Sequence, residues 1–281
     1  MAVLTIARLT LLEAARRRLL LAVAVLTLVL VGFTTWGFQR LIGTLTNVSV
    51  TEVKTITATL LILIVFMFSF IFSLGAVFVS APSIATDLES GIALAMLPRP
   101  IRRSDLVLGK WLGLSILVGG YAVLTIGLEF LSVNLIAGYL PPHPLTSLVY
   151  LVGECVVLMG LALLISTRLA PMTGGIVALV LFGIAWMGGI AEGIGLAVDN
   201  STIRNVGTIS RLVLPTDGLW RGALFNLEPS ILTAVAGASR AASANPFLVN
   251  APPSAAFTLW AVLWIAGILG LTAYSFSRRE L

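Results

Sequence analysis

Six long apolar runs, separated by shorter polar stretches, dominate the hydrophobic pattern of this chain. They cover residues 19–36, 56–80, 107–135, 148–166, 175–198 and 257–274. A helix needs roughly 20 apolar residues to cross the hydrocarbon core of a bilayer, so each run predicts one membrane-spanning helix. The expected fold class is an all-α integral membrane protein with six transmembrane helices in a single domain, residues 1–281.

Three segments outside these runs are too long to be turns. Residues 1–18 are rich in arginine and lead directly into the first run, which predicts a retained interfacial helix, because no small-residue cleavage site follows. Residues 81–106 form a charged loop that begins at Pro82. Residues 199–256 contain a stretch that predicts short interfacial helices before the last run.

The distribution of positive charge sets the expected topology. An even number of spans puts both termini on one side of the membrane. Most of the 17 lysines and arginines then share that side with the N-terminus, as the positive-inside rule requires. We therefore expect a multi-pass protein of the cell (cytoplasmic) membrane with both termini and residues 81–106 in the cytoplasm, and with residues 199–256 outside it.

Composition supports this class and excludes others. The chain is 58% hydrophobic and 10% charged, with a mean hydropathy of +1.07. Its net charge of +5 comes from basic residues beside the apolar runs, where they orient helices toward lipid headgroups, so nucleic acid is not implied. His143 and Cys155 are the only residues of their kinds, which leaves no metal cluster and no catalytic pair.

The charged loop carries a pattern of residues. It reads Asp87-x-Glu89-Ser90-Gly91, then Arg99-Pro100-Ile101-Arg102-Arg103, and is followed by Leu108-Gly109-Lys110. So much charge in one loop of a membrane protein favours a docking site for a soluble partner. The alternative is that these charges are solvated residues that only set topology.

This pattern resembles the signature of permease subunits of type-2 ABC exporters, the group that includes sodium, drug and copper-enzyme-maturation permeases. The resemblance covers the whole chain, and residues 214–221, Leu-Pro-Thr-Asp-Gly-Leu-Trp-Arg, are similar to the copper-maturation branch. The resemblance implies an elbow helix at residues 1–18 and a coupling-helix loop at residues 81–106. The coupling residues that it implies are Asp87, Glu89, Ser90, Gly91, Arg99, Pro100, Arg102 and Arg103.

The resemblance also implies partners. No Gly-x-x-x-x-Gly-Lys-Ser/Thr sequence occurs in the chain, because Gly109-Lys110 is followed by Trp111. This chain should therefore bind no cofactor, and ATP and Mg²⁺ should bind a separate ABC ATPase subunit, present in two copies. A second copy of the permease, membrane lipids and an accessory extracytoplasmic protein are the other partners expected.

Three carboxylates fall inside the predicted spans. Glu129, Glu154 and Glu192 would be costly in contact with lipid, so they should face the bundle interior or a cavity. They could line a translocation path, or they could be structural groups bonded between helices. An ion-coupled secondary transporter that uses these carboxylates is the alternative function, whereas an intramembrane enzyme lacks the necessary residues.

Two glycines suggest a helix contact. Gly189 and Gly193 are spaced four residues apart in the fifth run, and this spacing lets helices approach closely. They predict either a contact with the second copy of the permease or packing within one chain.

Overall fold

The computed structural model describes residues 2–15, 18–44, 48–89 and 102–278, and this part of the chain is helical without any strand. The helices are α1 (Ala2–Ala15), α2 (Arg18–Thr44), α3 (Val50–Glu89), α5 (Arg103–Ala137), α6 (Pro144–Ser166), α7 (Pro171–Ala197), α8 (Ser201–Val213), α9 (Thr216–Leu227), α10 (Ser230–Ala238) and α11 (Ala255–Ser277), with a 3₁₀ turn, η1 (Arg240–Ala244). Six of them, α2, α3, α5, α6, α7 and α11, are long and apolar enough to cross a membrane. The predicted all-α membrane fold with six spans is confirmed.

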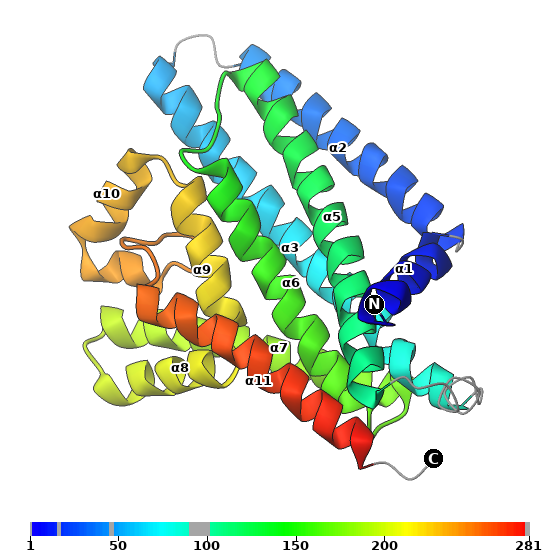
Figure 1. The fold of residues 1–281 in the computed structure, drawn as a ribbon. Coiled ribbons are helices and arrows are strands. Elements are labelled where there is room, and N and C mark those ends of the chain that lie inside the picture. The colour runs from blue at the N-terminus through cyan, green and yellow to red at the C-terminus, as the bar shows by residue number, and fades with distance from the viewer. Residues whose placement is uncertain (1, 16–17, 45–47, 90–101, 279–281) are drawn as a thin grey trace.

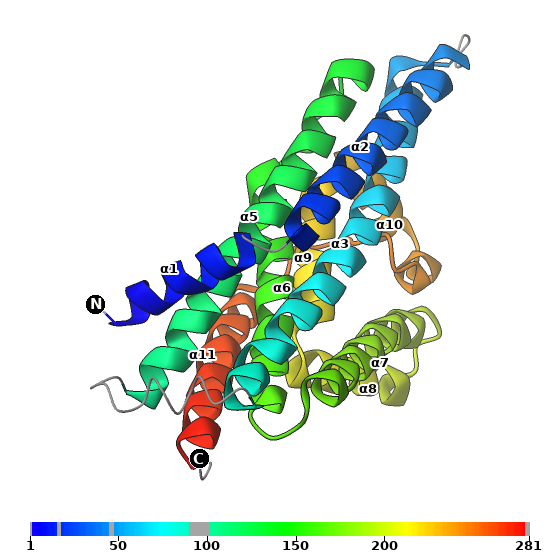
Figure 2. The same ribbon diagram turned by 90° about the vertical axis from the view of Figure 1, so that its right-hand side faces the viewer.

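Helices α5 and α6 lie side by side at the centre of the arrangement: α5 contacts α1, α2, α3 and α11, and α6 contacts α3, α7, α9 and α11. Figure 1 shows the start of α1, the C-terminal end of α3 and the C-terminal end of α11 toward the same end of the molecule. Helix α1 crosses the first part of α5 at a steep angle, as Figure 2 shows. A basic start therefore forms a helix of its own, separate from the first span.

Helix α3 is longer than the sequence predicted. Its apolar run was expected to end before Pro82, but the helix continues through Pro82 to Glu89. A proline inside a helix removes one backbone hydrogen bond. Ala81 and Ile84 are buried on either side of Pro82, and the Lys110 ammonium on α5 donates to the carbonyl of Ser83, so packing holds this turn in the helix.

Aromatic side chains fill the space between α3, α7 and α9. Phe66 of α3 packs against Trp186 of α7, Trp220 of α9 and Phe247 of the segment before α11, with ring centroids 4.9–5.8 Å apart. Such contacts bury large apolar areas and fix the rings relative to one another. They hold the segment after α7 against the spanning helices.

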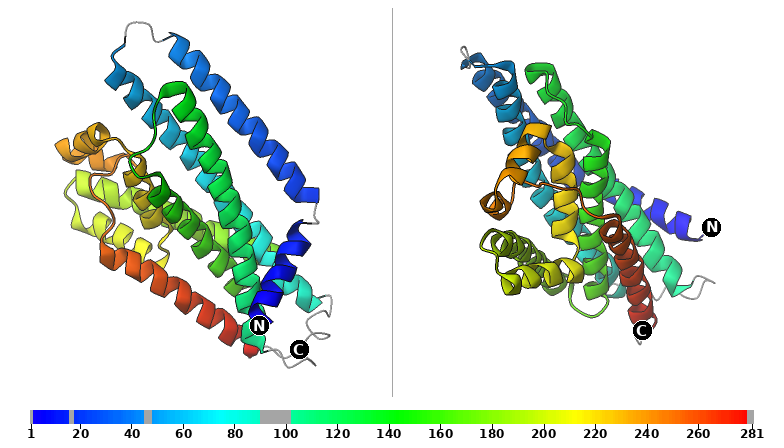
Figure 3. Two further views of the ribbon diagram at one scale, coloured as in Figure 1. Left: turned by 45° about the horizontal axis from the view of Figure 1, so that its top comes forward. Right: turned by 90° about the vertical axis from the view of Figure 1, so that its left-hand side faces the viewer.

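Helix α8 folds back along α7 and forms a hairpin with it, and after a short turn α9 leads away from α8. Figure 3 shows α8 beside α7, and α9 packs on α6. The sequence predicted short helices here, lying flat at the interface. The helices are present, but the indole of Trp264, near the middle of α11, donates to the carbonyl of Val213 at the end of α8, so α8 extends along the bundle.

Candidate functional site: a charge cluster between α7, α8 and α9

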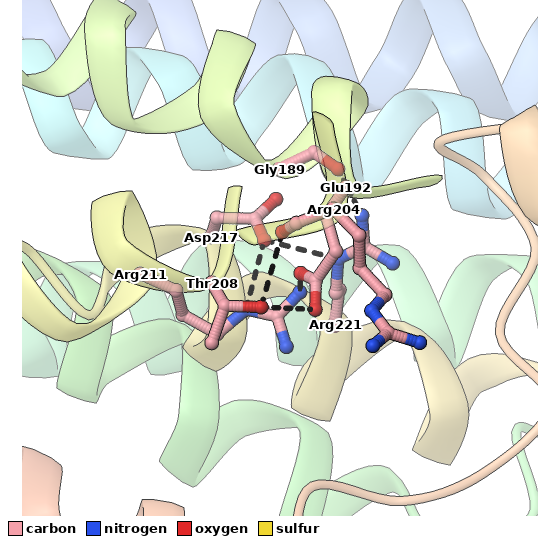
Figure 4. Close-up of polar contacts among 7 residues, drawn as sticks. All are labelled: Gly189, Glu192, Arg204, Thr208, Arg211, Asp217 and Arg221. Atoms are coloured by element: carbon pink, nitrogen blue, oxygen red, sulfur yellow. Dashed lines mark hydrogen bonds and ion pairs between the residues drawn. The ribbon is translucent and has the colours of Figure 1, made fainter. Parts of the chain in front are cut away.

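Four charged side chains meet where α7, α8 and α9 come together, and we call them the hairpin cluster: Glu192, Arg211, Asp217 and Arg221 (Figure 4). Arg211 pairs with Glu192 through Nη2, and its Nε lies 3.4 Å from Asp217 Oδ2. Arg221 donates through Nε to the same Asp217 oxygen at 3.0 Å. Two carboxylates thus balance two guanidinium groups.

Backbone and hydroxyl groups complete this cluster. Arg221 Nη2 donates to the carbonyl of Gly189 at 2.7 Å, and the Thr208 hydroxyl donates to Glu192 Oε1 at 3.3 Å. Asp217 is only 5% exposed, so its charge depends on these neighbours and not on water. Removing one member would leave the others poorly compensated in a setting of low polarity.

Close approach of the helices makes the cluster possible. A Cβ atom at Gly189 would collide with the Asp217 carboxylate, and one at Gly207 would collide with Glu192 and with the backbone of Gly188. Glycine at these two positions lets α8 and α9 lie against α7 with their charged groups in contact. These glycines therefore determine how closely the paired charges of the different helices approach one another.

The hairpin cluster lies deep in the bundle. Asp217 is buried at the start of α9, and α9 packs against α6 and α7. Charged groups at such a depth are costly unless they are paired or face water. The pairing seen here meets that requirement.

The structure places the three predicted carboxylates in different surroundings. Glu192 belongs to the hairpin cluster. Glu154, on α6, is buried and accepts a hydrogen bond of 2.8 Å from Ser69 on α3. Glu129 lies between α5 and α2, where it accepts a 3.0 Å hydrogen bond from Thr34. Bonds between helices are what the structural interpretation of these residues expects, and a role in a translocation path stays a prediction.

The two glycines predicted for a subunit contact face their own chain. Gly189 lies against Asp217, and Gly193 lies against the backbone of Ser243, whose hydroxyl also donates to the Gly193 carbonyl at 3.2 Å. This is the packing within one chain that the sequence left as an alternative. A contact with a second copy at these glycines stays a prediction.

Part of the predicted coupling set lies outside the described residues, namely Ser90, Gly91, Arg99 and Pro100. Asp87 and Glu89 fall on the last turns of α3, where the structure describes only the backbone. Arg102 is exposed and precedes α5. Arg103, the first residue of α5, donates through Nη1 to the carbonyls of Phe276 and Ser277 at 3.3 and 3.0 Å.

Residues around the coupling segment connect it to α1. Gly109 and Gly113 on α5 lie directly beneath Ile6 and Ala7 of α1, so α1 sits close to the start of α5. Lys110, which lies between these two glycines in the sequence, is buried, and its ammonium group donates to the carbonyl of Ser83 near the end of α3. The last motif of the sequence pattern, residues 108–110, therefore ties α1, α3 and α5 together.

No group of three or more His, Cys, Asp or Glu residues that could hold a metal ion occurs among the residues the structure describes. Cys155 is free and buried, and His143 is exposed before α6. The carboxylates and guanidinium groups of the hairpin cluster can form and break ion pairs.

The sequence analysis included Asp217 and Arg221 in the segment that resembles the copper-maturation branch, but it did not place them or Arg211 in a charge cluster. Asp217 and Arg221 are four residues apart, a spacing that brings opposite charges together on a helix, and this signal could have found them. Arg211 carries no such signal, because its partners come from two other helices.

Comparison with known families identifies one match. The sequence model of a family described as ABC-2 family transporter protein matches residues 4–281. No curated protein matches the sequence.

Proposed function

The chain belongs to the ABC-2 family of transporter membrane proteins, and we propose that it forms the translocation path of an exporter driven by a separate ATPase subunit. The family match over nearly the whole chain, together with six candidate spans, carries this conclusion. ATP and Mg²⁺ would bind the ATPase, because this sequence has no phosphate-binding loop of its own.

The docking site that we propose lies where α1, the end of α3 and the start of α5 meet. These elements sit at one end of the molecule in Figure 2, and Lys110 and the two glycines of α5 fix them together. Under this proposal, α1 is the elbow helix and residues 81–106 are the coupling segment. Because α3 continues unbroken to Glu89, a push on residues 85–89 would act directly on a spanning helix.

Copurification tests the proposed function. The chain, expressed with the ATPase subunit of its own system, should retain that ATPase through detergent extraction. Its presence should change the ATPase rate in proteoliposomes. A chain that carries cargo down an ion gradient without nucleotide would instead be a secondary transporter, and the proposal would be wrong.

Reversing a charge at the coupling segment tests the docking site. We expect Glu89→Lys to reduce ATPase binding by about tenfold or more, because a residue that pairs with a basic group would repel it after the change. The matched control is Asp199→Lys, an exposed site at the far end of α7. Equal binding by the wild type and Glu89→Lys would remove Glu89 from the docking surface.

Two copies of the chain are proposed to assemble around the path. Helix α7 exposes Ile184 and Met187 on its outer face, and cysteines placed there should crosslink two copies if α7 lies at the contact. The native Cys155 is buried and gives little background. Crosslinks that form only within one chain would place the contact elsewhere.

A further inference from the structure

Residues 226–228, which we call the junction, lie where α9 ends, and each of them binds another segment of the chain. The carbonyl of Asn226 accepts a hydrogen bond from the backbone N–H of His143 at 3.2 Å. The carbonyl of Leu227 accepts one from the Tyr139 hydroxyl at 2.8 Å. The last carbonyls of a helix lack partners within the helix, so these donors from the turn between α5 and α6 fix the end of α9.

The third contact of the junction is made by a carboxyl group. Glu228 Oε1 accepts a hydrogen bond from the backbone N–H of Val249 at 3.0 Å. Val249 belongs to residues 245–254, the segment that leads into α11. Figure 1 shows α10 and the turn between α5 and α6 on the side of the molecule away from the C-terminal end of α11. The Glu228 side chain therefore ties the end of α9 to the segment before the last span.

The Glu228 carboxyl group is almost fully enclosed. It is only 2% exposed, and its second oxygen, Oε2, is buried without a hydrogen-bond partner in the described structure. No lysine or arginine forms an ion pair with it in the part of the chain that the structure describes. Burying an ionised carboxylate without a compensating charge is costly, whereas the protonated acid carries no such cost.

The groups that face Glu228 do not compensate a negative charge. Tyr139, after the end of α5, is itself buried, and burial and Glu228 both raise the pKa of its hydroxyl, so it stays neutral. Residues 245–254 and α10 contain no titratable side chain. Titratable side chains on the other neighbouring elements are exposed or bonded elsewhere, namely His143, Glu52, Lys54, Tyr150 and Arg221.

We propose that Glu228 is a proton-dependent latch, which holds the segment before α11 against the end of α9 while its carboxyl group is protonated and releases that segment when the group ionises. Burial raises the pKa of the Glu228 carboxyl to about 7, against the lowering effects of the Val249 N–H and the Thr233 hydroxyl. Release exposes the group to water, where its pKa returns toward its ordinary value. The latched state therefore binds more protons, and rising pH favours release.

The latch goes beyond the proposed transport function and does not depend on it, because every contact lies within this chain. If both termini are cytoplasmic, the junction lies on the extracytoplasmic side of the membrane. The latch then makes the segment that enters the last span sensitive to the pH outside the cell.

Hydrogen exchange tests the latch on the full chain purified in detergent. Exchange of the peptide that contains Val249 is followed by mass spectrometry at pH 5 and pH 8, and each rate is divided by that of an unfolded reference at the same pH. In the wild type, this corrected rate should rise about tenfold or more from pH 5 to pH 8. A peptide from α6 should show no such rise, because release is confined to the junction.

Glu228→Gln should abolish the rise. Glutamine keeps an oxygen that can accept from the Val249 N–H, but it does not ionise, so the corrected rate should differ less than about twofold between the two pH values. Glu52→Gln is the matched control, since it makes the same change at an exposed glutamate of α3 and should keep the wild-type rise.

Three results would overturn the latch. A flat corrected rate in the wild type would show that the segment is not released, and this result needs no variant that folds. A rise in Glu228→Gln equal to that of the wild type would assign the titration to another group. A rise shared by the α6 peptide would indicate general loosening of the protein. None of these results bears on the proposed transport function, which the copurification experiment tests.

Discussion

Single glycines control how closely α8 approaches α7. Gly195 faces the backbone of Arg204 on α8, so a methyl group there would press against main-chain atoms that cannot turn away. Gly183, on the same helix, has open space around its Cα. The same substitution should therefore have opposite effects at the two positions.

We expect Gly195→Ala to destabilise the protein by about 1–3 kcal/mol through overpacking. Gly183→Ala should be neutral or stabilising by up to about 1 kcal/mol, because alanine favours the helix. Thermal unfolding in detergent measures both. A lower Tm for Gly183→Ala than for Gly195→Ala would contradict the packing described for α7 and α8.

Glu228 is a buried acid outside the spans, between α9 and α10. Burial raises its pKa from 4.5 to about 7, against the effect of the Val249 backbone N–H that donates to it at 3.0 Å. The folded state then binds more protons than the unfolded state between about pH 4.5 and 7, so this group makes stability fall as pH rises through that range.

Glu228→Gln should remove this part of the pH dependence, since glutamine does not titrate. Tm measured at pH 5, 6, 7 and 8 should fall less steeply in the variant than in the wild type. Glu13→Gln, at an exposed position on α1, is the control and should keep the wild-type slope. Parallel curves for the wild type and Glu228→Gln would contradict this assignment.

At the scale of elements, the hairpin cluster holds α8 and α9 to α7 by charge. The chain also contains an exposed ion pair of the same chemistry, Arg240 with Asp199 at 2.9 Å, with side chains 74% and 80% exposed. Exposed pairs contribute little, whereas a buried carboxylate whose loss leaves two arginines unpaired is costly to remove.

Asp217→Asn should therefore destabilise the protein by about 2–4 kcal/mol, an estimate reduced from that for a fully buried pair because both arginines are partly exposed. Asp199→Asn makes the same chemical change and should cost less than about 0.5 kcal/mol. Equal shifts in Tm for the two variants would show that the hairpin cluster is not a stabilising contact.

The sequence predicted the spans better than it predicted the position of α8. Apolar run length determines where a chain can cross a bilayer, and each predicted run lies within a helix of the structure to within one residue. Run length gave no warning that α3 continues past Pro82, because a buried contact with α5 holds that turn. The depth of α8 was not predicted either, since its polar residues suit an interfacial position and only the partners on α7 and α11 reveal where it packs.

The candidate site was predicted only in part, because contacts between residues distant in sequence define most of it. Glu192 was found because a carboxylate in an apolar run is costly on its own. Arg211 lies in a polar helix, where an arginine is ordinary. Its importance comes from contacts with residues distant in sequence.

At the scale of the whole molecule, the turn before α6 and the turn after it lie at opposite ends of a spanning helix. If both termini are cytoplasmic, His143 lies on the extracytoplasmic side of the membrane and Leu169 lies on the cytoplasmic side. His143→Cys should react with a membrane-impermeant maleimide on intact cells, and Leu169→Cys should react only after the cells have been permeabilised. The reverse labelling pattern would show that the topology is opposite to the predicted one.

The position of α8 has a consequence for how the protein is made. A segment with Arg204 and Arg211 in 13 residues is too polar to enter the bilayer as an independent unit. It can settle beside α7 only when Glu192 is there to neutralise it, and its last carbonyls gain their indole donors only after α11 has been synthesised. Folding should therefore end with the docking of α8, which cannot be complete before α11 has been synthesised. The chain should reach its functional structure in one late step and not helix by helix.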